Sequence, residues 1–297
     1  MVARVVLALS LAGSSSLTAQ DVVGTLLVAH GGSEAWNADV RAVAREVRTG
    51  GPVAVSFLMG AGAPTSRFQD QVAALRAAGA TRVAVVPLLV SSHSGHYEQV
   101  RWLAGQVDSL EAAMAAHLQH AGIERALDAV PLVVTRALDD APELGRILVD
   151  RARALLAGDS AGAHALFLVG HGPNSPEDHA KWMMGLRTLA EHVRDVVGFR
   201  DARAGVVRDD AAPAVRAEAV RAVHDVVALQ AAATGTEVLV LPLAIAAGRF
   251  TDRTLRADLA GLPVRYDGQP ILPHADVARW VERRVAETAR TALSPRE

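Results

Sequence analysis

The chain has 297 residues, 51% hydrophobic and 21% charged, so it can bury one large core or two of ordinary size and is not a disordered protein. Its 30 basic and 32 acidic residues give a formal net charge of -2, which leaves no broad basic surface for nucleic acid. Without cysteine, the chain has neither disulfides nor thiolate metal sites, and a metal ion must be held by carboxylates, water or some of its 11 histidines.

Residues 1–20 have the layout of a secretory signal peptide. Arg4 precedes an apolar run over 5–11, and small and polar residues follow before Asp21. This layout predicts a periplasmic or secreted protein, or a cytoplasmic one if the segment is not cleaved. The alternative is an apolar extra helix on a cytoplasmic protein, because Leu17 lies where a smaller residue is preferred. The run is shorter than the roughly 20 apolar residues that span a bilayer, and no other segment predicts an integral membrane span.

From residue 22 onward, apolar runs of strand length alternate with longer segments of helical periodicity. In the first half, the predicted strands cover 22–30, 53–58, 83–90 and 130–135, and the predicted helices cover 33–48, 65–78, 96–117 and 142–156. In the second half, strands are predicted over 165–170, 202–207 and 238–245, a shorter strand-like segment over 264–270, and helices over 177–197, 214–233 and 275–286. Strands that alternate with helices in this way predict parallel sheets covered by helices on both faces.

The same order of elements occurs twice, which predicts an α/β fold of two similar three-layer α/β/α units, each with a four-stranded, largely parallel sheet. We expect an N-terminal unit over 21–157, a linker over 158–162 and a C-terminal unit over 163–297. Pro87 follows His30 by 57 residues and Pro242 follows His171 by 71, so the second unit carries about fourteen extra positions, which we expect in its helices or first loop. Such an internal duplication places both halves in one chain, so a monomer is expected to suffice.

Histidines close several of the predicted strands. His30 and His171 end the first strand of each unit, and His93 and His96 follow the third strand of the first unit. Ligands of open parallel sheets bind outside the carboxyl ends of the strands, so we expect these first-unit histidines to share an active cleft. Imidazoles there, with Glu98 at the start of the next helix, predict an incomplete coordination sphere for Co²⁺, Ni²⁺ or Fe²⁺, suited to delivering the ion.

The second unit differs at the matching position, where Arg249 stands in place of His96. This difference removes the partner of His171. We therefore interpret the second unit as a degenerate copy that closes the cleft of the first.

Two motifs resemble those of the class II chelatases, which comprise the sirohydrochlorin cobalt or iron chelatases and the related ferrochelatases. Val28-Ala29-His30-Gly31-Gly32 is similar to the strand-end histidine and glycine of the family. Pro87-Leu88-Leu89-Val90, followed by Gly95-His96, is similar to its second motif. The resemblance covers nearly the whole chain after Asp21, and larger members of the family fuse two copies of the unit that smaller members assemble as a homodimer.

The resemblance implies a lyase of tetrapyrrole biosynthesis that inserts a divalent metal into a sirohydrochlorin-type tetrapyrrole, releases two protons and needs no organic cofactor. By this resemblance, His30 and His96 are metal-binding and catalytic, ligating the ion and accepting pyrrole protons. Glu98 would act as a carboxylate relay, although its His-x-Glu spacing is closer to that of ferrochelatases than to that of cobalt chelatases. His93 would be a third ligand or a partner of a ligand.

Several alternatives remain open at this stage. His93 could replace His96 as the ligand, and His93 and Glu98 could be simple loop or helix-start residues. Three arginines could bind the carboxylates of a tetrapyrrole, namely Arg101, Arg249 and Arg253. The remaining histidines are expected on the surface or on helices: His117, His120, His164, His179, His192, His224 and His274.

The predicted signal peptide favours another function, since sirohydrochlorin-type substrates are expected inside the cell. An exported, non-catalytic protein that binds a metal or a tetrapyrrole would keep the same fold. A structural or interaction protein on that fold is a third possibility, because a fold alone does not define a function. Neither the metal nor the tetrapyrrole is defined by the sequence.

Overall fold

The computed structural model describes residues 21–127 and 130–293, and the predicted signal peptide lies outside these residues. The first half contains β1 (Val23–Ala29), α1 (Glu34–Glu46), β2 (Val53–Phe57), α2 (Phe68–Ala77), β3 (Arg82–Leu88), α3 (Gly95–Leu103), α4 (Ala112–His120), β4 (Leu132–Val134) and α5 (Pro142–Leu156). The second half contains β5 (Ala165–Gly170), α6 (Pro176–Val197), β6 (Asp201–Val206), α7 (Pro213–Thr234), β7 (Val238–Leu243), α8 (Leu255–Asp258), β8 (Val264–Arg265) and α9 (Ala275–Leu293). A π-helical turn, Phe250–Thr254, leads into α8.

The two halves form separate four-stranded sheets with the same strand order. The orders are β2-β1-β3-β4 and β6-β5-β7-β8, and every neighbouring pair of strands is parallel. The predicted fold class is therefore confirmed. Because β1 lies between β2 and β3, the residues that follow these three strands meet at one edge of the first sheet.

The extra length of the second unit lies in its helices. Helices α6 and α7 have 22 residues each, whereas α1 and α2 have 13 and 10. This agrees with the expected location of the additional residues.

One predicted helix is wrong. The segment 96–117 was expected to form a single helix, but it forms α3 and α4 with an irregular segment between them. Gly105 ends α3 with a φ of 74°, a left-handed conformation that costs glycine little. The amide of Gln106 then donates to the carbonyl of Arg101 at 2.9 Å, which closes the last turn.

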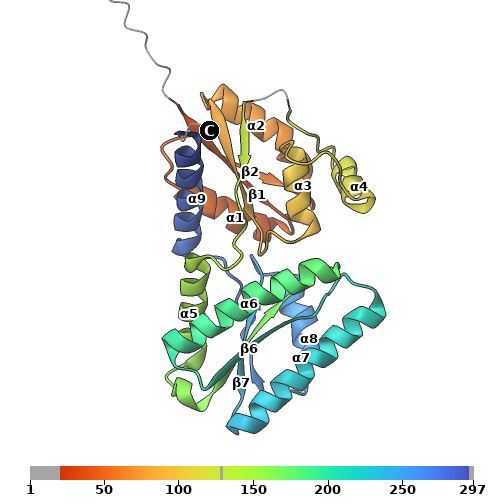
Figure 1. Cartoon of the computed structure of the whole chain (residues 1–297), viewed down its shortest axis with the longest axis vertical. Coiled ribbons are helices and arrows are strands. Elements are labelled where there is room, and N and C mark those ends of the chain that lie inside the picture. The colour runs from red at the N-terminus through yellow and green to blue at the C-terminus, as the bar shows by residue number, and fades with distance from the viewer. Residues whose placement is uncertain (1–20, 128–129, 294–297) are drawn as a thin grey trace, which may run out of the picture.

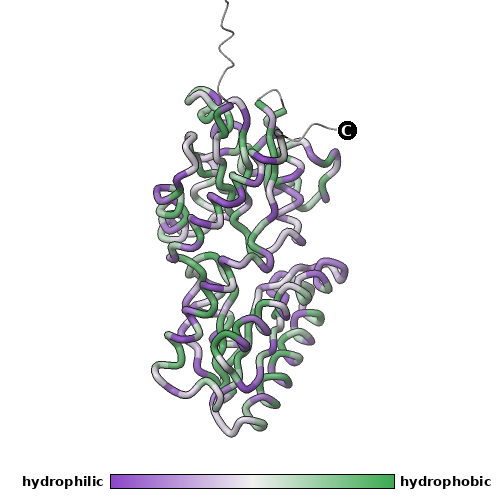
Figure 2. The backbone as a smooth tube through the Cα atoms, turned by 60° about the vertical axis from the view of Figure 1, so that its left-hand side comes forward, coloured by the Kyte–Doolittle hydropathy of each residue, from purple (hydrophilic) through white to green (hydrophobic). Residues whose placement is uncertain are grey.

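Each sheet buries both faces. In the first sheet, Leu26 and Val28 pack against α2 and α3, while Leu27 and Ala29 point to the opposite face, towards α1 and α9. This alternation follows from the two-residue period of a strand. The distribution of hydrophobic and hydrophilic residues along the backbone can be followed in Figure 2.

The two units exchange their last helices. Helix α5 follows the first sheet in sequence but packs on β7 and α6 of the second unit, whereas α9 at the end of the second unit packs on β1, β3 and α1 of the first. Figure 1 shows α9 beside the first unit and α5 beside the second, with the two helices in succession along one side of the molecule. One continuous hydrophobic cluster consequently includes residues of both sheets. The predicted linker, 158–162, falls between α5 and β5, and the domain limits derived from the sequence stay predictions.

Ion pairs between buried carboxylates and partly exposed arginines join the two exchanged helices. The Arg283 guanidinium donates to both carboxylate oxygens of Glu143, at 2.9 and 2.7 Å, and Arg146 Nε donates to Asp276 Oδ2 at 3.0 Å. Glu143 and Asp276 are 6% and 3% exposed. Two nearly buried carboxylates thus each meet an arginine of the partner helix, which fixes α5 relative to α9. Across the described ranges, none of the helices combines the length and the apolar character that a membrane crossing requires.

Candidate functional site

His30 lies directly after β1 and is held by the backbone that follows it. Its Nδ1 is 2.7 Å from the carbonyl oxygen of Gly31, and its own carbonyl accepts from the Met59 amide at 2.9 Å. Gly31 has a φ of 91°, and a Cβ atom there would lie 2.1 Å from the Met59 carbonyl oxygen. Glycine is therefore required at this position for the loop to close over β2. Because a carbonyl only accepts, His30 Nδ1 carries the hydrogen and Nε2 keeps its lone pair.

His96 lies in the first turn of α3 and is oriented by Gln99 one turn later. Its Nδ1 is 2.8 Å from Gln99 Oε1, while Gln99 Nε2 donates to the Met114 carbonyl at 2.7 Å. The bond to Met114 fixes the orientation of the amide, so that oxygen faces the imidazole. His96 Nδ1 consequently donates, and its Nε2 is also free to bind a ligand. Gln99 is fully buried.

The two imidazoles lie edge to face, with ring centroids 4.6 Å apart and planes at 90°. Burial, together with the neighbouring His30, lowers the pKa of His96 to about 4, although the hydrogen bond to Gln99 opposes this effect. Burial likewise lowers the pKa of His30, with a further contribution from the charge of His171. Both rings are therefore neutral at pH 7 and present lone pairs that protons do not occupy.

The second unit faces this histidine pair. His171 follows β5 as His30 follows β1, and its Nδ1 is 3.0 Å from the carbonyl of Gly172. Its Nε2 is 3.2 Å from Asp210 Oδ2. Burial opposes protonation of His171, but the hydrogen bonds with Asp210 and Gly172 prevail and raise its pKa. The Asp210 charge also acts on His30 and His96, where it partly opposes the lowering of their pKa values by burial.

Direct contacts bring the carboxyl ends of the two sheets together. The indole Nε1 of Trp182 in α6 donates to the His93 carbonyl at 2.6 Å. A Cβ atom at Gly248, after β7, would be 3.9 Å from the Trp36 ring at the start of α1. The loops that follow β1, β3, β5, β6 and β7 therefore converge on one region.

The other residues predicted at the site occupy different surroundings. His93 lies on the loop before α3 and is half-buried. Glu98 forms an ion pair with Arg101, in which Arg101 Nη1 lies 3.0 and 3.1 Å from the two carboxylate oxygens. Arg249 and Arg253 are exposed beside the π-helical turn and have no ion-pair partner among the described residues.

Two residues at the site were missed by the sequence reasoning. Gln99 orients His96, and the Asp210 charge acts on both His30 and His96. The spacing of Gln99, three residues after His96 on a helix, was an available signal. So was the position of Asp210 just after a strand.

One of the histidines expected on the surface or on helices is instead buried outside a helix. His164 is 6% exposed and lies just before β5, with its Nδ1 3.0 Å from the Glu237 carbonyl. It therefore lies at the amino end of its sheet, opposite to the end that carries His171. Its polar contact explains how an imidazole is accommodated in the core.

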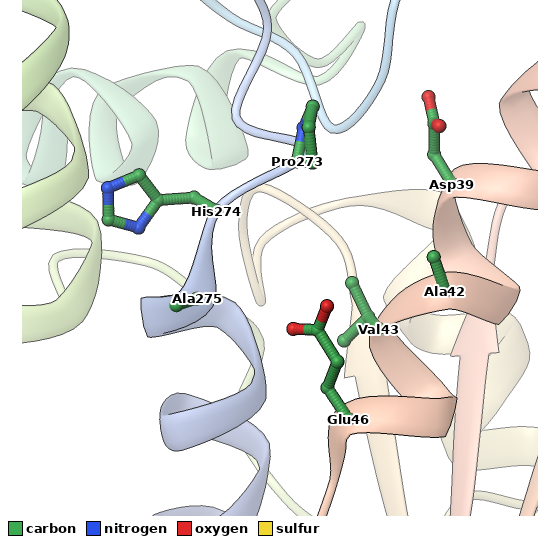
Figure 3. A pocket seen from close by; sticks show the side chains of 7 residues that line it. All are labelled: Asp39, Ala42, Val43, Glu46, Pro273, His274 and Ala275. Carbon is green, nitrogen blue, oxygen red and sulfur yellow. The ribbon is translucent and has the colours of Figure 1, made fainter.

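A cavity of about 280 Å³ lies elsewhere, between α1 and the start of α9. Asp39 and Glu46 extend from α1 at this cavity, whereas the His274 ring turns away towards α5, where its Nε2 is 3.4 Å from Asp150 (Figure 3). None of the histidines that we predict as ligands lines it. It lies where the start of α9 meets α1, and no residue of α5 lines it.

Comparisons with known proteins agree with this architecture. Residues 24–155 match the CbiX family model. The fold is similar to that of "SirB from Bacillus subtilis with Fe3+", with a TM-score of 0.61 and 18% identity over 91% of this chain and 97% of that one. SirB from Bacillus subtilis subspecies spizizenii in complex with cobalt gives a TM-score of 0.57 and 17% identity over 91% and 96% of the two chains.

A third similar structure belongs to a larger protein. It is a multi-domain protein of Deinococcus radiodurans described as structurally similar to chelatases, with a TM-score of 0.56 and 18% identity over 90% of this chain and 55% of that one. The comparison with curated proteins finds no match. The structural likenesses establish the fold of both units, and the family model identifies the unit that carries His30 and His96. The resemblance read from the two motifs is thereby confirmed for the first unit, where residues 24–155 match the CbiX family model, and both units share the fold of the SirB structures.

Proposed function

We propose that the protein inserts a divalent metal ion into a sirohydrochlorin-type tetrapyrrole, using His30 and His96. The observation that carries this proposal is the pair of half-buried, neutral imidazoles whose ring centroids are 4.6 Å apart. Each ring has its Nδ1 bound to an acceptor, so that both Nε2 atoms remain free to ligate an ion. Two protein ligands leave the remaining coordination positions open to water and to the nitrogens of the tetrapyrrole.

The reaction exchanges one ion for two protons. As the bonds from Nε2 to the ion break, bonds from the tetrapyrrole nitrogens to the ion form, and two pyrrole N–H bonds are lost. The two released Nε2 atoms are then available to accept those protons. The Asp210 carboxylate favours the resulting positive charge, because its own charge partly opposes the lowering of the His30 and His96 pKa values by burial.

The substrates are proposed by chemical class. Imidazole nitrogens suit late first-row ions, so Co²⁺, Fe²⁺ and Ni²⁺ are the proposed metals. Structures similar in fold are named as complexes with Fe3+ or cobalt, which supports this class. The exposed guanidinium groups of Arg249 and Arg253 are proposed to bind the carboxylates of the tetrapyrrole. For Arg101 this role requires its ion pair with Glu98 to open.

The proposed roles of Glu98 and His93 depend on local rearrangement. Glu98 is engaged by Arg101, so a relay through its carboxylate needs that pair to break. Among the described carboxylates, Asp210 is better supported as the acidic partner, since its charge acts on both His30 and His96. A ligand role for His93 stays a prediction.

The decisive experiment is a turnover assay with Co²⁺ or Fe²⁺ and sirohydrochlorin, followed by absorbance. We expect the wild-type protein to accelerate insertion over the free reaction, and His30→Ala and His96→Ala each to abolish that acceleration. His120→Ala is the matched control, because His120 is exposed at the end of α4, and it is expected to keep full activity.

Two results would contradict the proposal. If the wild-type protein gives no acceleration but binds the metal or tetrapyrrole, the protein is the exported binding protein that residues 1–20 favour. If both alanine variants keep full activity, the histidine pair is not the site. Mass spectrometry of the N-terminus from native cells tests export separately, since cleavage near residue 20 supports a periplasmic or secreted protein and an intact Met1 argues against it.

A further inference from the structure

The second unit places three further ligand groups at the carboxyl ends of its sheet. His171 follows β5, and Asp209 and Asp210 follow β6, which pairs with β5 up to the register Gly170↔Val206. One ligand atom from each of these three residues lies within 4.8 Å of the others. One imidazole nitrogen and two carboxylate oxygens at these separations can reach a single ion.

The hydrogen-bond geometry leaves a position between His171 and Asp210 that a proton or a metal ion can occupy. His171 Nδ1 faces the Gly172 carbonyl at 3.0 Å, so it carries a hydrogen and leaves the lone pair on Nε2. That Nε2 faces Asp210 Oδ2 at 3.2 Å, and an ionised carboxylate only accepts. Two acceptors this close require a positive ion between them, either a proton or a metal.

The site repeats the geometry of the first unit. His30 and His171 close equivalent strands, and each directs Nδ1 to the carbonyl of the glycine that follows it. The other ligands differ, because Arg249 stands where the first unit has His96. The carboxylates of Asp209 and Asp210, which follow β6, take the place of that histidine. Asp209 uses Oδ1 for its ion pair with Arg216, which leaves Oδ2 available.

The three groups are also accessible to ions from solution. The side chains of His171, Asp209 and Asp210 are 34%, 21% and 71% exposed. Only Asp210 is highly exposed. An ion from solution can therefore reach the site, while the side chains of His171 and Asp209 are held by their surroundings. Partial exposure also keeps the desolvation cost of an entering ion moderate.

We propose that His171, Asp209 and Asp210 form a second divalent-metal site, on the second unit, facing the His30–His96 pair. One imidazole and two carboxylates suit Co²⁺, Fe²⁺ or Zn²⁺ more than a soft ion such as Cu⁺. The protein therefore binds two ions per chain, one on each unit. The second unit keeps a metal site of its own in place of the histidine pair, and this inference does not depend on catalysis by His30 and His96.

The test counts bound Co²⁺, added alone, by equilibrium dialysis of the full-length protein. We expect two ions per wild-type chain and one in the double variant His171→Ala/Asp210→Asn, with affinity at the lost site at least tenfold weaker. The double variant His30→Ala/His96→Ala should also retain one ion. The matched control His120→Ala/Asp195→Asn, which removes an exposed histidine and a largely exposed aspartate from other surfaces, should retain two.

Three outcomes separate the possibilities. A wild-type stoichiometry of one that only His30→Ala/His96→Ala removes would overturn the second site. Complete loss of binding in each double variant, with unchanged circular dichroism, would mean one ion shared by both units and would also overturn it. If His171→Ala/Asp210→Asn loses one ion while His30→Ala/His96→Ala keeps two, the second site stands and the proposed function fails. The single variant Asp210→Glu keeps a carboxylate and should retain two ions, which guards against an effect on folding.

Discussion

Gln99 offers the sharpest test of how the histidine pair is prepared for a metal. Its Oε1 accepts from His96 Nδ1 at 2.8 Å, and its Nε2 donates to the Met114 carbonyl at 2.7 Å. Gln99→Leu preserves approximate volume but removes both bonds. The His96 ring then loses the acceptor that fixes its tautomer, and the form with hydrogen on Nε2, which cannot ligate, becomes populated.

The magnitude follows from these two bonds. Loss of a partner that orients a metal-ligating histidine typically lowers affinity 10- to 100-fold, or by about 1.4 to 2.7 kcal/mol. The substitution also leaves the His96 N–H and the Met114 carbonyl without this partner, and we expect a loss of about 2 kcal/mol in the free energy of unfolding. Binding and stability should therefore both decrease, by separately measurable amounts.

Calorimetric titration with Co²⁺ and urea denaturation measure the two effects. Gln230→Leu is the matched control, because Gln230 is 4% exposed and donates to the Leu166 carbonyl near the start of β5, away from the histidine pair. We expect this control to lose stability but to bind Co²⁺ as the wild type does. A folded Gln99→Leu protein with unchanged affinity at the His30–His96 pair would refute the reasoning.

Three more predictions concern the same framework. Gly31→Ala should displace His30 and weaken Co²⁺ binding in a titration, because its Cβ would lie 2.1 Å from the Met59 carbonyl oxygen. Gly50→Ala is the control, since Gly50 has a φ of 77° with open space around it. This control should lose only about 1 kcal/mol of the free energy of unfolding, the cost of its backbone conformation. NMR of the metal-free protein should find His96 neutral at pH 6 and titrating near its pKa of about 4. Because the unfolded chain takes up this proton near pH 6.5, the free energy of unfolding should fall as the pH drops from about 6.5 towards 4. A titration midpoint near 6.5 in the folded protein would contradict this. Glu143→Gln should lower the free energy of unfolding by about 3 kcal/mol. This is the lower end of the range for breaking a buried pair, because Arg283 keeps Glu287 as a partner. Urea denaturation at pH 7 would measure the change, with Glu177→Gln, which removes an exposed pair with Lys181, as the control.

Periodicity predicted most elements of this fold because both sheets are buried on two faces. Strand β5 is an uninterrupted apolar run and β1 is apolar apart from Thr25, and α5 and α6 show one apolar face, so their limits follow closely from the sequence. The break between α3 and α4 was missed because apolar residues continue beyond it. Gly105 marked the end of α3, but a single glycine within a helical pattern is a weak signal.

The exchange of α5 and α9 could not be predicted from the sequence. Periodicity indicates which residues of a helix are buried, but not which sheet buries them. Leu144 and Ile147 of α5 would suit either sheet equally well by hydrophobicity. The ion pairs of Glu143 and Asp276 carry the specific information, since each joins partners 140 and 130 residues apart.

The first-unit histidines were predictable for a geometric reason. His30 follows β1 and His96 follows β3, and these strands are neighbours with the register Ala29↔Leu88, so the sheet itself brings the two side chains together. Asp210 was not predicted because no histidine stands beside it in the sequence. The same rule of strand ends, applied to the carboxylates after β6, would have found it.

The helix exchange also determines how the two units can act together. Asp210 influences His30 and His96 only because the carboxyl ends of the two sheets face each other, and that orientation depends on helices that each unit supplies to the other. A unit expressed alone would lack one helix of its own sheet and expose the apolar face of another. The units therefore cannot separate without disrupting the shared core, and the spacing between the two groups of ligands is a property of the packing of α5 against α9. Substitutions at the contact between α5 and α9 should consequently change the distance between the two groups of ligands even when every ligand is intact.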